Sequence, residues 1–422
     1  MNYQKTVLSN GLRVVSSRME HVRSATLVIY VGVGSRYERA DEAGISHFLE
    51  HMVFKGTEQR PDPALISQEI EGVGGILNAS TGKESTNYWV KVPSAHLARS
   101  FDVLADMLRH SRFAPEEIDK ERGVIVEEIR GVEDTPDELV HDAIDELIWP
   151  EDPLGRPISG WESTVAAIDR ARLVRFLQDE YRPDRMVIAA AGDLRHEEVV
   201  ALADQHFGDL RNSNLDTFRP VDGTQRAPRV QIMTKPTNEA HLCLGFPAVP
   251  YTDERRYAQE MLDAVLSSGM SSRLFVELRE RLGLAYEVYA FFREYADTGQ
   301  GVVYAGIDPA RLDETVHAIV RELRKLREEP VPAEELRRTK ELRKGRILVG
   351  LEDSRAVASW IGGQELVFGE VWTPEQLMDR IDAVSAEDMQ VLARDLFQPE
   401  RYNLVTIGPV EGEQRLLGLL RE

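Results

Sequence analysis

The sequence predicts an α+β protein with two similar repeated domains, each a mainly antiparallel sheet packed with helices. Three observations support this class: strand-like runs mixed with helical segments of about ten or more residues, no strict strand–helix alternation, and a weak internal repeat. A chain of 422 residues is also too long for one ordinary hydrophobic core. The order of elements therefore argues against a doubly wound parallel sheet.

The internal repeat relates residues 181–194, YRPDRMVIAAAGDL, to residues 397–410, FQPERYNLVTIGPV. Each copy follows a helical pattern and then becomes apolar, as a buried strand does. Three residues recur at a spacing of 216, namely Pro183, Arg185 and Gly192 as Pro399, Arg401 and Gly408. Between the halves, residues 211–229 are polar and contain Pro and Gly, which is typical of a linker. We therefore expect one domain at 1–210, a linker at 211–229 and a second similar domain at 230–422.

Composition and charge exclude several classes of protein. No run approaches the roughly eighteen apolar residues of a membrane span, and the N-terminus lacks an apolar signal core. Cys243 is the only cysteine, which excludes an internal disulfide and favours a cytoplasmic setting. The net charge of -21 argues against nucleic acid and membrane surfaces as partners. This acidity either keeps the protein soluble or forms a cavity that attracts basic peptides, and composition does not choose between the two.

The strongest chemical signal lies in residues 41–57, DEAGISHFLEHMVFKGT. On a helix, His47 and His51 lie about one turn apart on one face, where a single zinc ion can bind both imidazoles. Glu50 lies at the edge of that face, where its carboxylate can take a proton from water. The order HxxEH is the inverted form of the commoner zincin motif. Two histidines in a polar helical stripe would give the same letters, so this interpretation requires a third ligand.

A second helix, predicted over residues 115–133, contains candidates for that ligand. On a helical wheel, Glu121 and Glu128 share a face that also holds Val124, Ile125 and Val132. A carboxylate on an apolar stripe is costly unless it is paired or binds a metal. Glu127 points about 100° away, toward solvent. Glu128 is therefore the better metal ligand and Glu121 the supporting residue, unless the segment is only a charged amphipathic helix.

These motifs resemble those of the inverzincins, which include pitrilysin, insulin-degrading enzyme and the mitochondrial processing peptidase. The similar blocks occur in the family's order: GVGSRYERADEAGISHFLEHMVFKGT, then GGILNASTGKESTNYWV, ERGVIVEE, PLGRPISG and RERLGLAY. The chain length is similar to that of the short, dimeric branch nearest the processing peptidase. One departure is Glu127, where the processing peptidase has a basic residue.

The resemblance implies a role for each matched residue of the metal site. His47, His51 and Glu128 match the zinc ligands. Glu50 matches the general base, and Glu121 matches an acidic residue that supports the site.

The resemblance also implies substrate-binding residues. Asn78 and Ala79 match an edge strand to which the peptide adds as a further strand, although Asn78 could instead only cap a turn. Arg279 and Tyr286 match a pair that binds the substrate backbone and steadies the oxyanion. Without the resemblance, they would be a solvated helical arginine and an ordinary packing residue.

The predicted function is that of a zinc-dependent endopeptidase, a hydrolase that cleaves extended peptides or unfolded protein segments inside an enclosed chamber. In the second half, the stretch corresponding to the HxxEH helix, residues 260–269, contains no His, so only the first half should bind metal. Since one chain holds the full set of groups, we expect a homodimer with two sites. Two alternatives remain: a non-catalytic scaffold subunit of the same family, and an active chain that requires an unrelated partner subunit.

Overall fold

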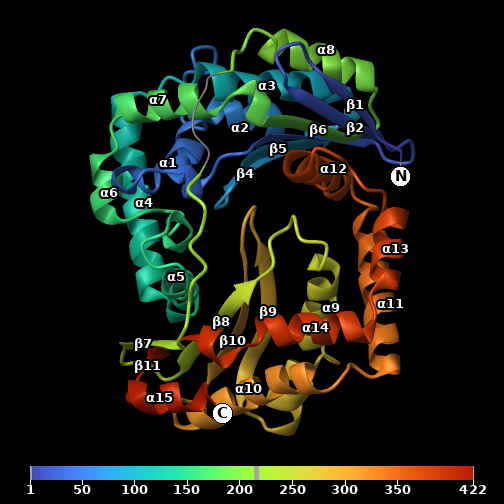
Figure 1. Cartoon of the computed structure of the whole chain (residues 1–422). Helices are drawn as coiled ribbons and strands as arrows, with labels where there is room; N and C mark the ends of the chain where they lie inside the picture. Colours follow the sequence, from blue (N-terminus) through green and yellow to red (C-terminus); the bar gives the residue numbers. More distant parts are fainter. Residues whose placement is uncertain (1, 213–217, 422) are drawn as a thin grey trace. The chain divides into compact units, whose positions relative to one another are not determined.

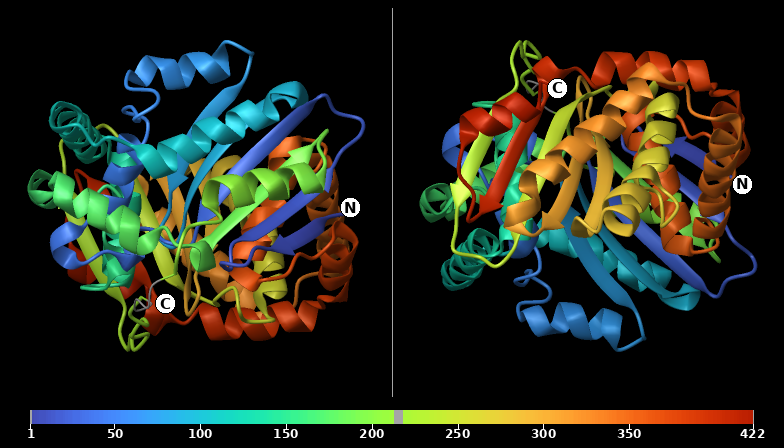
Figure 2. Two further views of the ribbon diagram at one scale, coloured as in Figure 1. Left: turned by 90° about the horizontal axis from the view of Figure 1, so that it is seen from above. Right: turned by 90° about the horizontal axis from the view of Figure 1, so that it is seen from below.

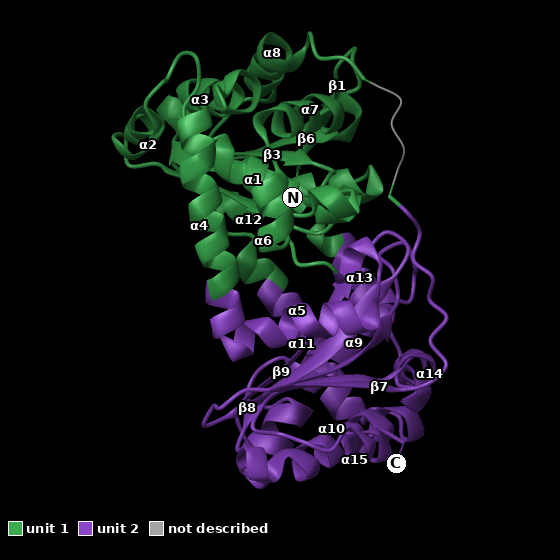
Figure 3. Cartoon of the chain, turned by 90° about the vertical axis from the view of Figure 1, so that its left-hand side faces the viewer, with its two compact units in different colours: residues 1–130, 156–218, 347–375 green, residues 131–155, 219–346, 376–422 purple. Residues whose placement is uncertain are grey.

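A computed structural model describes residues 2–212 and 218–421, which form two compact units (Figure 3). Unit 1 comprises residues 1–130, 156–218 and 347–375, and unit 2 comprises residues 131–155, 219–346 and 376–422. Each unit contains one sheet with helices packed on it. The predicted α+β class with two similar domains is therefore confirmed. Among the residues described, no helix is both long and apolar enough to cross a membrane.

Unit 1 is built on a six-stranded sheet in the order β1-β2-β6-β3-β5-β4 (Figure 1). β2 and β6 are parallel, and the other neighbours are antiparallel. The strands are β1 (Gln4–Val7), β2 (Arg13–Arg18), β3 (Ser24–Val31), β4 (Ile76–Thr81), β5 (Thr86–Pro93) and β6 (Met186–Gly192). Because side chains alternate along a strand, Ile188 and Ala190 of β6 enter one hydrophobic core while Val187 and Ala189 enter another.

Helices pack on both faces of this sheet. One face carries most of them, and the left-hand view of Figure 2 shows α3 (teal) and α8 (green) across the strands. The helices are α1 (Ile45–Met52), α2 (Pro63–Glu71), α3 (Leu97–His110), α4 (Pro115–Asp134), α6 (Glu162–Ala167), α7 (Arg170–Glu180) and α8 (His196–Phe207). The other face packs against α12 (Ser354–Phe368), which contributes Val357, Ala358 and Ile361.

Unit 2 is built on a five-stranded sheet in the order β7-β11-β8-β10-β9. β7 and β11 are parallel, and the other neighbours are antiparallel. The strands are β7 (Arg229–Thr234), β8 (Ala240–Ala248), β9 (Ala285–Glu294), β10 (Gly299–Ile307) and β11 (Asn403–Gly408).

The helices of unit 2 also pack on both faces of its sheet. α5 (Pro136–Ile148) covers one face, where Ile144 packs with Cys243 and Val405. On the opposite side of β8, the Phe246 ring lies 5.0 Å from that of Phe397, at the end of α14. The remaining helices are α9 (Arg256–Ser267), α10 (Leu312–Glu328), α11 (Ala333–Gly350), α13 (Pro374–Ala383), α14 (Ala386–Leu396) and α15 (Glu413–Leu419).

The internal repeat is visible in the topology. The order β2-β6-β3-β5-β4 of unit 1 corresponds to the order β7-β11-β8-β10-β9 of unit 2, with the parallel pair in the same place. The repeated Pro183–Arg185 and Pro399–Arg401 each form a short 3-10 turn before the corresponding strand. Gly192 ends β6 with a φ of 130°, and a Cβ there would lie 2.2 Å from the Ser24 carbonyl oxygen. The repeated glycine therefore marks a position where only glycine fits.

The compact units differ from the segments expected at 1–210 and 230–422. The reason is that the helices packed on each sheet include one from the other half of the chain. α5 lies within residues 1–210 but belongs to unit 2, and α12 lies within residues 230–422 but belongs to unit 1. The strands follow the expected halves except that β7 begins at Arg229. Of the linker expected at 211–229, residues 213–217 lie outside the described residues.

Candidate metal centre

The HxxEH segment forms α1, an amphipathic helix of eight residues. Ile45, Phe48, Leu49 and Met52 are buried in the core of unit 1. His47, Glu50 and His51 are half-buried on the remaining face of the helix. The apolar spacing thus fixes which face of α1 enters the core, and this leaves the three polar groups together.

The α4 helix brings its carboxylates to the same region, although its buried stripe differs from the expected one. The stripe consists of Ile118, Glu121, Ile125 and Ile129, whereas Val124 is 45% exposed. Only Glu121 lies within the stripe, and Glu128 stands at its edge. A helical wheel gives the relative angles of side chains, but the neighbouring elements decide which row is covered.

His47, His51 and Glu128 form a compact group whose candidate ligand atoms all lie within 4.8 Å of one another. The Nε2 atoms of His47 and His51 are 3.1 Å apart. Glu128 Oε2 lies 3.9 Å from His47 Nε2 and 3.7 Å from His51 Nε2. Zinc binds nitrogen at about 2.0–2.1 Å, so donor atoms of a tetrahedral site lie about 3.3 Å apart. Two imidazoles and a carboxylate at these separations fit a zinc ion. Within the part of the chain that is described, this is the one such group of three or more His, Cys, Asp or Glu side chains.

Glu121 orients His51 through the imidazole nitrogen that faces away from Glu128. His51 Nδ1 lies 2.8 Å from Glu121 Oε1, and the second oxygen of that carboxylate lies 2.6 Å from Lys55 Nζ. Burial alone would raise the pKa of Glu121, but hydrogen bonds from His51 and Lys55 hold it below its ordinary value. The ionised carboxylate accepts a hydrogen bond from the Nδ1–H group, so the other ring nitrogen, Nε2, is left to bind a metal.

His47 is held in the neutral form that metal binding requires. Burial lowers its pKa to about 4, and the neighbouring His51 adds to the effect. At neutral pH the imidazole therefore carries no charge, and no proton has to leave it before it binds a cation.

Glu50 is placed beside the metal group by a residue of the sheet. Thr81, the last residue of β4, donates a hydrogen bond of 2.5 Å from Oγ1 to Glu50 Oε2. Burial raises the pKa of Glu50, while the Thr81 hydrogen bond and the nearby His51 oppose that rise. A carboxylate with a raised pKa that is fixed by one oxygen suits a general base, because the other oxygen can accept a proton.

Asn78 and Ala79 lie on β4, which is the edge strand of the unit 1 sheet. Ala79 pairs with Tyr88 of β5. Its N–H donates a hydrogen bond of 2.8 Å to the side-chain oxygen of Asn78. Asn78 therefore covers a backbone donor of its own strand.

Arg279 and Tyr286 belong to unit 2 and lie on either side of a chain reversal. Arg279 is on the π-helical turn Phe275–Arg281, with its guanidinium carbon 5.2 Å from the centre of the Phe275 ring. Gly283 has a φ of 58°, and β9 then begins at Ala285. Tyr286 is 66% exposed. The chain reverses at Gly283, because glycine readily takes this positive φ.

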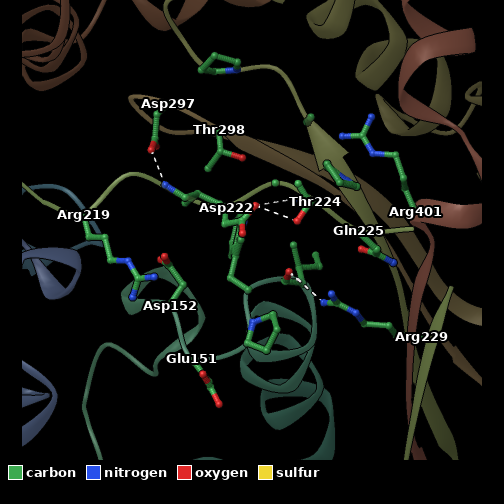
Figure 4. Close-up of a pocket in the computed structure, with 18 residues that line it drawn as sticks. Glu151, Asp152, Arg219, Asp222, Thr224, Gln225, Arg229, Asp297, Thr298 and Arg401 are labelled. Atoms are coloured by element: carbon green, nitrogen blue, oxygen red, sulfur yellow. Dashed lines mark hydrogen bonds between the residues drawn. The ribbon is translucent and has the colours of Figure 1, made fainter. Parts of the chain in front are cut away.

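A separate cavity of about 450 Å³ lies within unit 2 (Figure 4). Its lining includes Arg219, Arg229 and Arg401 together with Asp152, Asp222 and Asp297. Figure 4 shows Arg229 reaching the end of α5, where it donates a hydrogen bond of 3.4 Å to the Ile148 carbonyl oxygen. Neither His nor Cys lines this cavity, so it does not offer a second site of the same kind.

Two residues of the metal centre were missed in the sequence. Lys55 follows His51 by four residues, and this spacing was a usable signal that both side chains lie on one side. Thr81 gave no local signal, because it lies 31 residues from Glu50 and reaches it only through the fold.

The fold and the site together define a class: a two-domain α+β protein with an inverted-motif His/Glu group of the kind found in zinc metallopeptidases. Two family profiles match the chain, one described as Insulinase (Peptidase family M16) over residues 13–161 and one as Peptidase M16 inactive domain over residues 167–343. The chain belongs to peptidase family M16.

Relatives of similar length support this assignment. An uncharacterized zinc protease of Streptomyces coelicolor is 39% identical over 97% of this chain and 90% of its own. The uncharacterized zinc protease YmxG of Bacillus subtilis is 37% identical over 95% of this chain and 97% of its own. A protease from Helicobacter pylori shares the fold with a TM-score of 0.89 at 23% identity, covering 97% of this chain and 99% of that one. A chain of Complex III2 from Candida albicans has a TM-score of 0.84 at 17% identity, covering 99% of this chain and 100% of that one.

Proposed function

We propose that this protein is a zinc-dependent endopeptidase that cleaves extended peptides or unfolded protein segments. The observation that carries the proposal is the His47–His51–Glu128 group with Glu50 beside it. These groups supply the three protein ligands of a catalytic zinc site and a base. The zinc protease names of the relatives support the same cofactor.

In this proposal the zinc ion, when bound, supplies Lewis acidity toward the scissile carbonyl. Glu50 takes the proton of the attacking water and passes it to the leaving amine. Glu121 keeps His51 in the required tautomer, and Thr81 keeps Glu50 in place. Arg279 and Tyr286 bind the substrate backbone and stabilise the negative oxygen that develops.

We further propose that the substrate binds along the edge strand β4, at Asn78 and Ala79. A peptide that adds to a sheet edge is recognised mainly through its backbone, which gives affinity without a strict sequence requirement. Such a peptide must displace the Asn78 side chain from the Ala79 N–H. As part of the same proposal, the working protein is a cytoplasmic homodimer that encloses its substrate in a chamber.

A non-catalytic scaffold role is the second candidate, because residues 167–343 match the profile described as Peptidase M16 inactive domain. Retention of both histidines, Glu50 and Glu128 favours catalysis, since a scaffold needs no such group. The two candidates differ in a measurable property, namely zinc-dependent hydrolysis.

The test compares the wild-type protein with Glu50→Gln and with Glu127→Gln as a control. The wild-type protein should contain about one zinc per chain and should cleave a mixed peptide library, with activity lost to a chelator and restored by zinc. Glu50→Gln should keep its zinc and lose hydrolysis, because an amide cannot accept the water's proton. Glu127→Gln should retain both properties, since Glu127 is exposed and pairs with Arg130. Zinc binding without any peptide cleavage by the wild-type protein would favour the scaffold role.

A further inference from the structure

Glu38 is a buried carboxylate that caps the helix of the metal centre from outside that helix. It is 5% exposed, and its two oxygens accept hydrogen bonds from the backbone N–H groups of Gly44, at 2.7 Å, and Ser46, at 2.8 Å. These groups lie at the N-terminal end of α1, where backbone donors have no partner within the helix and the helix dipole favours negative charge.

The cap must come from elsewhere in the chain because the usual capping position has no room for a side chain. Gly44 immediately precedes α1 and has a φ of 94°. A Cβ atom added to Gly44 would lie 2.4 Å from the Ser159 carbonyl oxygen. A Cβ atom added to Gly160 would lie 2.2 Å from the Ala43 carbonyl oxygen. The backbone at Gly44 is thus in direct contact with the backbone at Gly160. This contact excludes the Ser, Thr, Asp or Asn side chain that commonly caps a helix. Glu38 supplies the missing acceptors.

Glu38 is itself held firmly. Arg156 donates a hydrogen bond of 3.1 Å to the Glu38 carbonyl oxygen, and the Arg156 carbonyl oxygen accepts one of 2.5 Å from Lys83 Nζ. Burial raises the pKa of the Glu38 carboxyl to about 7, and the hydrogen bonds from Ser46 and Gly44 oppose that rise. The cost of this burial is offset only while both oxygens keep their donors.

The two histidines of the metal centre depend on different supports. His51 has a carboxylate partner in Glu121, which fixes its ring. In contrast, His47 Nδ1 is buried and has no hydrogen-bond partner among the described residues. The place of His47 is therefore set by the backbone of the first turn of α1, which begins at Ile45 and which Glu38 holds through Ser46.

We propose that Glu38 is the positioning residue for His47: by capping the first turn of α1 it sets where this imidazole meets the metal. The inference rests on the proposed function, because it assumes that His47 is a zinc ligand. It adds a residue that touches neither metal nor substrate. Its loss should weaken metal binding through the backbone of α1, in the way that loss of an outer support weakens other metal sites.

The test measures zinc affinity by competition with a chelator, and the absorption spectrum of the cobalt-loaded protein as a report of ligand geometry. Glu38→Gln keeps one acceptor oxygen and places an amide N–H₂ against the other backbone donor. We expect it to lower zinc affinity about tenfold or more and to shift the cobalt spectrum. Glu38→Asp keeps the charge but is one methylene shorter, so it reaches only one donor and should show a smaller loss. It carries the test if Glu38→Gln does not fold.

The matched control is Glu42→Gln. Glu42 is another buried carboxylate of the same segment, and it pairs with Arg175 at 2.5 Å rather than capping α1. Its loss should lower the midpoint of thermal unfolding but leave zinc affinity and the cobalt spectrum unchanged. Equal zinc affinities and spectra for the Glu38 variants and Glu42→Gln would overturn the inference. A wild-type protein that binds zinc but cleaves no peptide would instead contradict the proposed function, and the comparison of these variants would still decide the role of Glu38.

Discussion

Replacement of Glu121 by Gln should weaken zinc binding without removing any zinc ligand. The Glu121 side chain is 6% exposed. Its carboxylate accepts one hydrogen bond of 2.8 Å from His51 Nδ1 and one of 2.6 Å from Lys55 Nζ. An amide has one acceptor oxygen and no charge, so one of these two donors must face an N–H₂ group. A hydrogen bond to a charged group contributes about 1.5–3 kcal/mol. That energy corresponds to a loss of about ten- to a hundredfold in zinc affinity.

Competition with a chelator measures this loss directly, with Glu117→Gln as the matched control. Glu117 lies one turn earlier on α4 and pairs with the exposed Lys120 at 2.5 Å. The Glu117→Gln substitution should have no effect on zinc affinity. Lys55→Met should cause a smaller loss than Glu121→Gln, because the contact between Glu121 and His51 remains. Wild-type affinity in Glu121→Gln, or an equal loss in Glu117→Gln, would refute this account of how His51 is oriented.

The remaining predictions concern the third ligand, the backbone crossing and the assembly. Glu128→Gln should lose zinc in metal analysis while Glu127→Gln keeps it, because only Glu128 faces the two histidines; equal loss would mean that the ligand is misassigned. Gly160→Ala should destabilise the protein in denaturant unfolding by about 2 kcal/mol or more, since its φ is 72° and a Cβ would meet the Ala43 carbonyl oxygen. Gly363→Ala, with open space around the added Cβ, should cause no loss. Light scattering should give about twice 47.7 kDa, and a mass of one chain would contradict the homodimer.

Features with a local pattern could be predicted from the sequence. The spacing of His47 and His51 together with the apolar residues between and beside them determines both the helix and its buried face, and the structure has both. The turn at Gly283 is also a local feature, because glycine alone readily takes the positive φ found there. Such features depend on residues within about one or two helical turns of each other.

Features that depend on distant neighbours could not be predicted. The exposed position of Val124 follows from which elements cover α4, and the angles of a helical wheel contain no such information. The same holds for α5 and α12, because an apolar stripe on a helix does not identify the sheet that buries it. Each packs on the sheet formed by the other half of the chain, so the compact units differ from the segments on either side of the linker.

In the second unit, the position of the HxxEH helix carries different side chains. At the repeat spacing of 216 residues, Asp263 takes the place of His47, and Ser267 that of His51. Ser267 accepts a hydrogen bond from the Ala290 N–H, so its hydroxyl is used within the unit. Burial raises the pKa of Asp263 to about 7, while the cationic Arg343 and Arg346 of α11 oppose that rise. In unit 1 the corresponding helix, α4, contributes carboxylates. Guanidinium groups are not zinc ligands, and this position has no histidine, so we expect one zinc per chain, held by unit 1 alone.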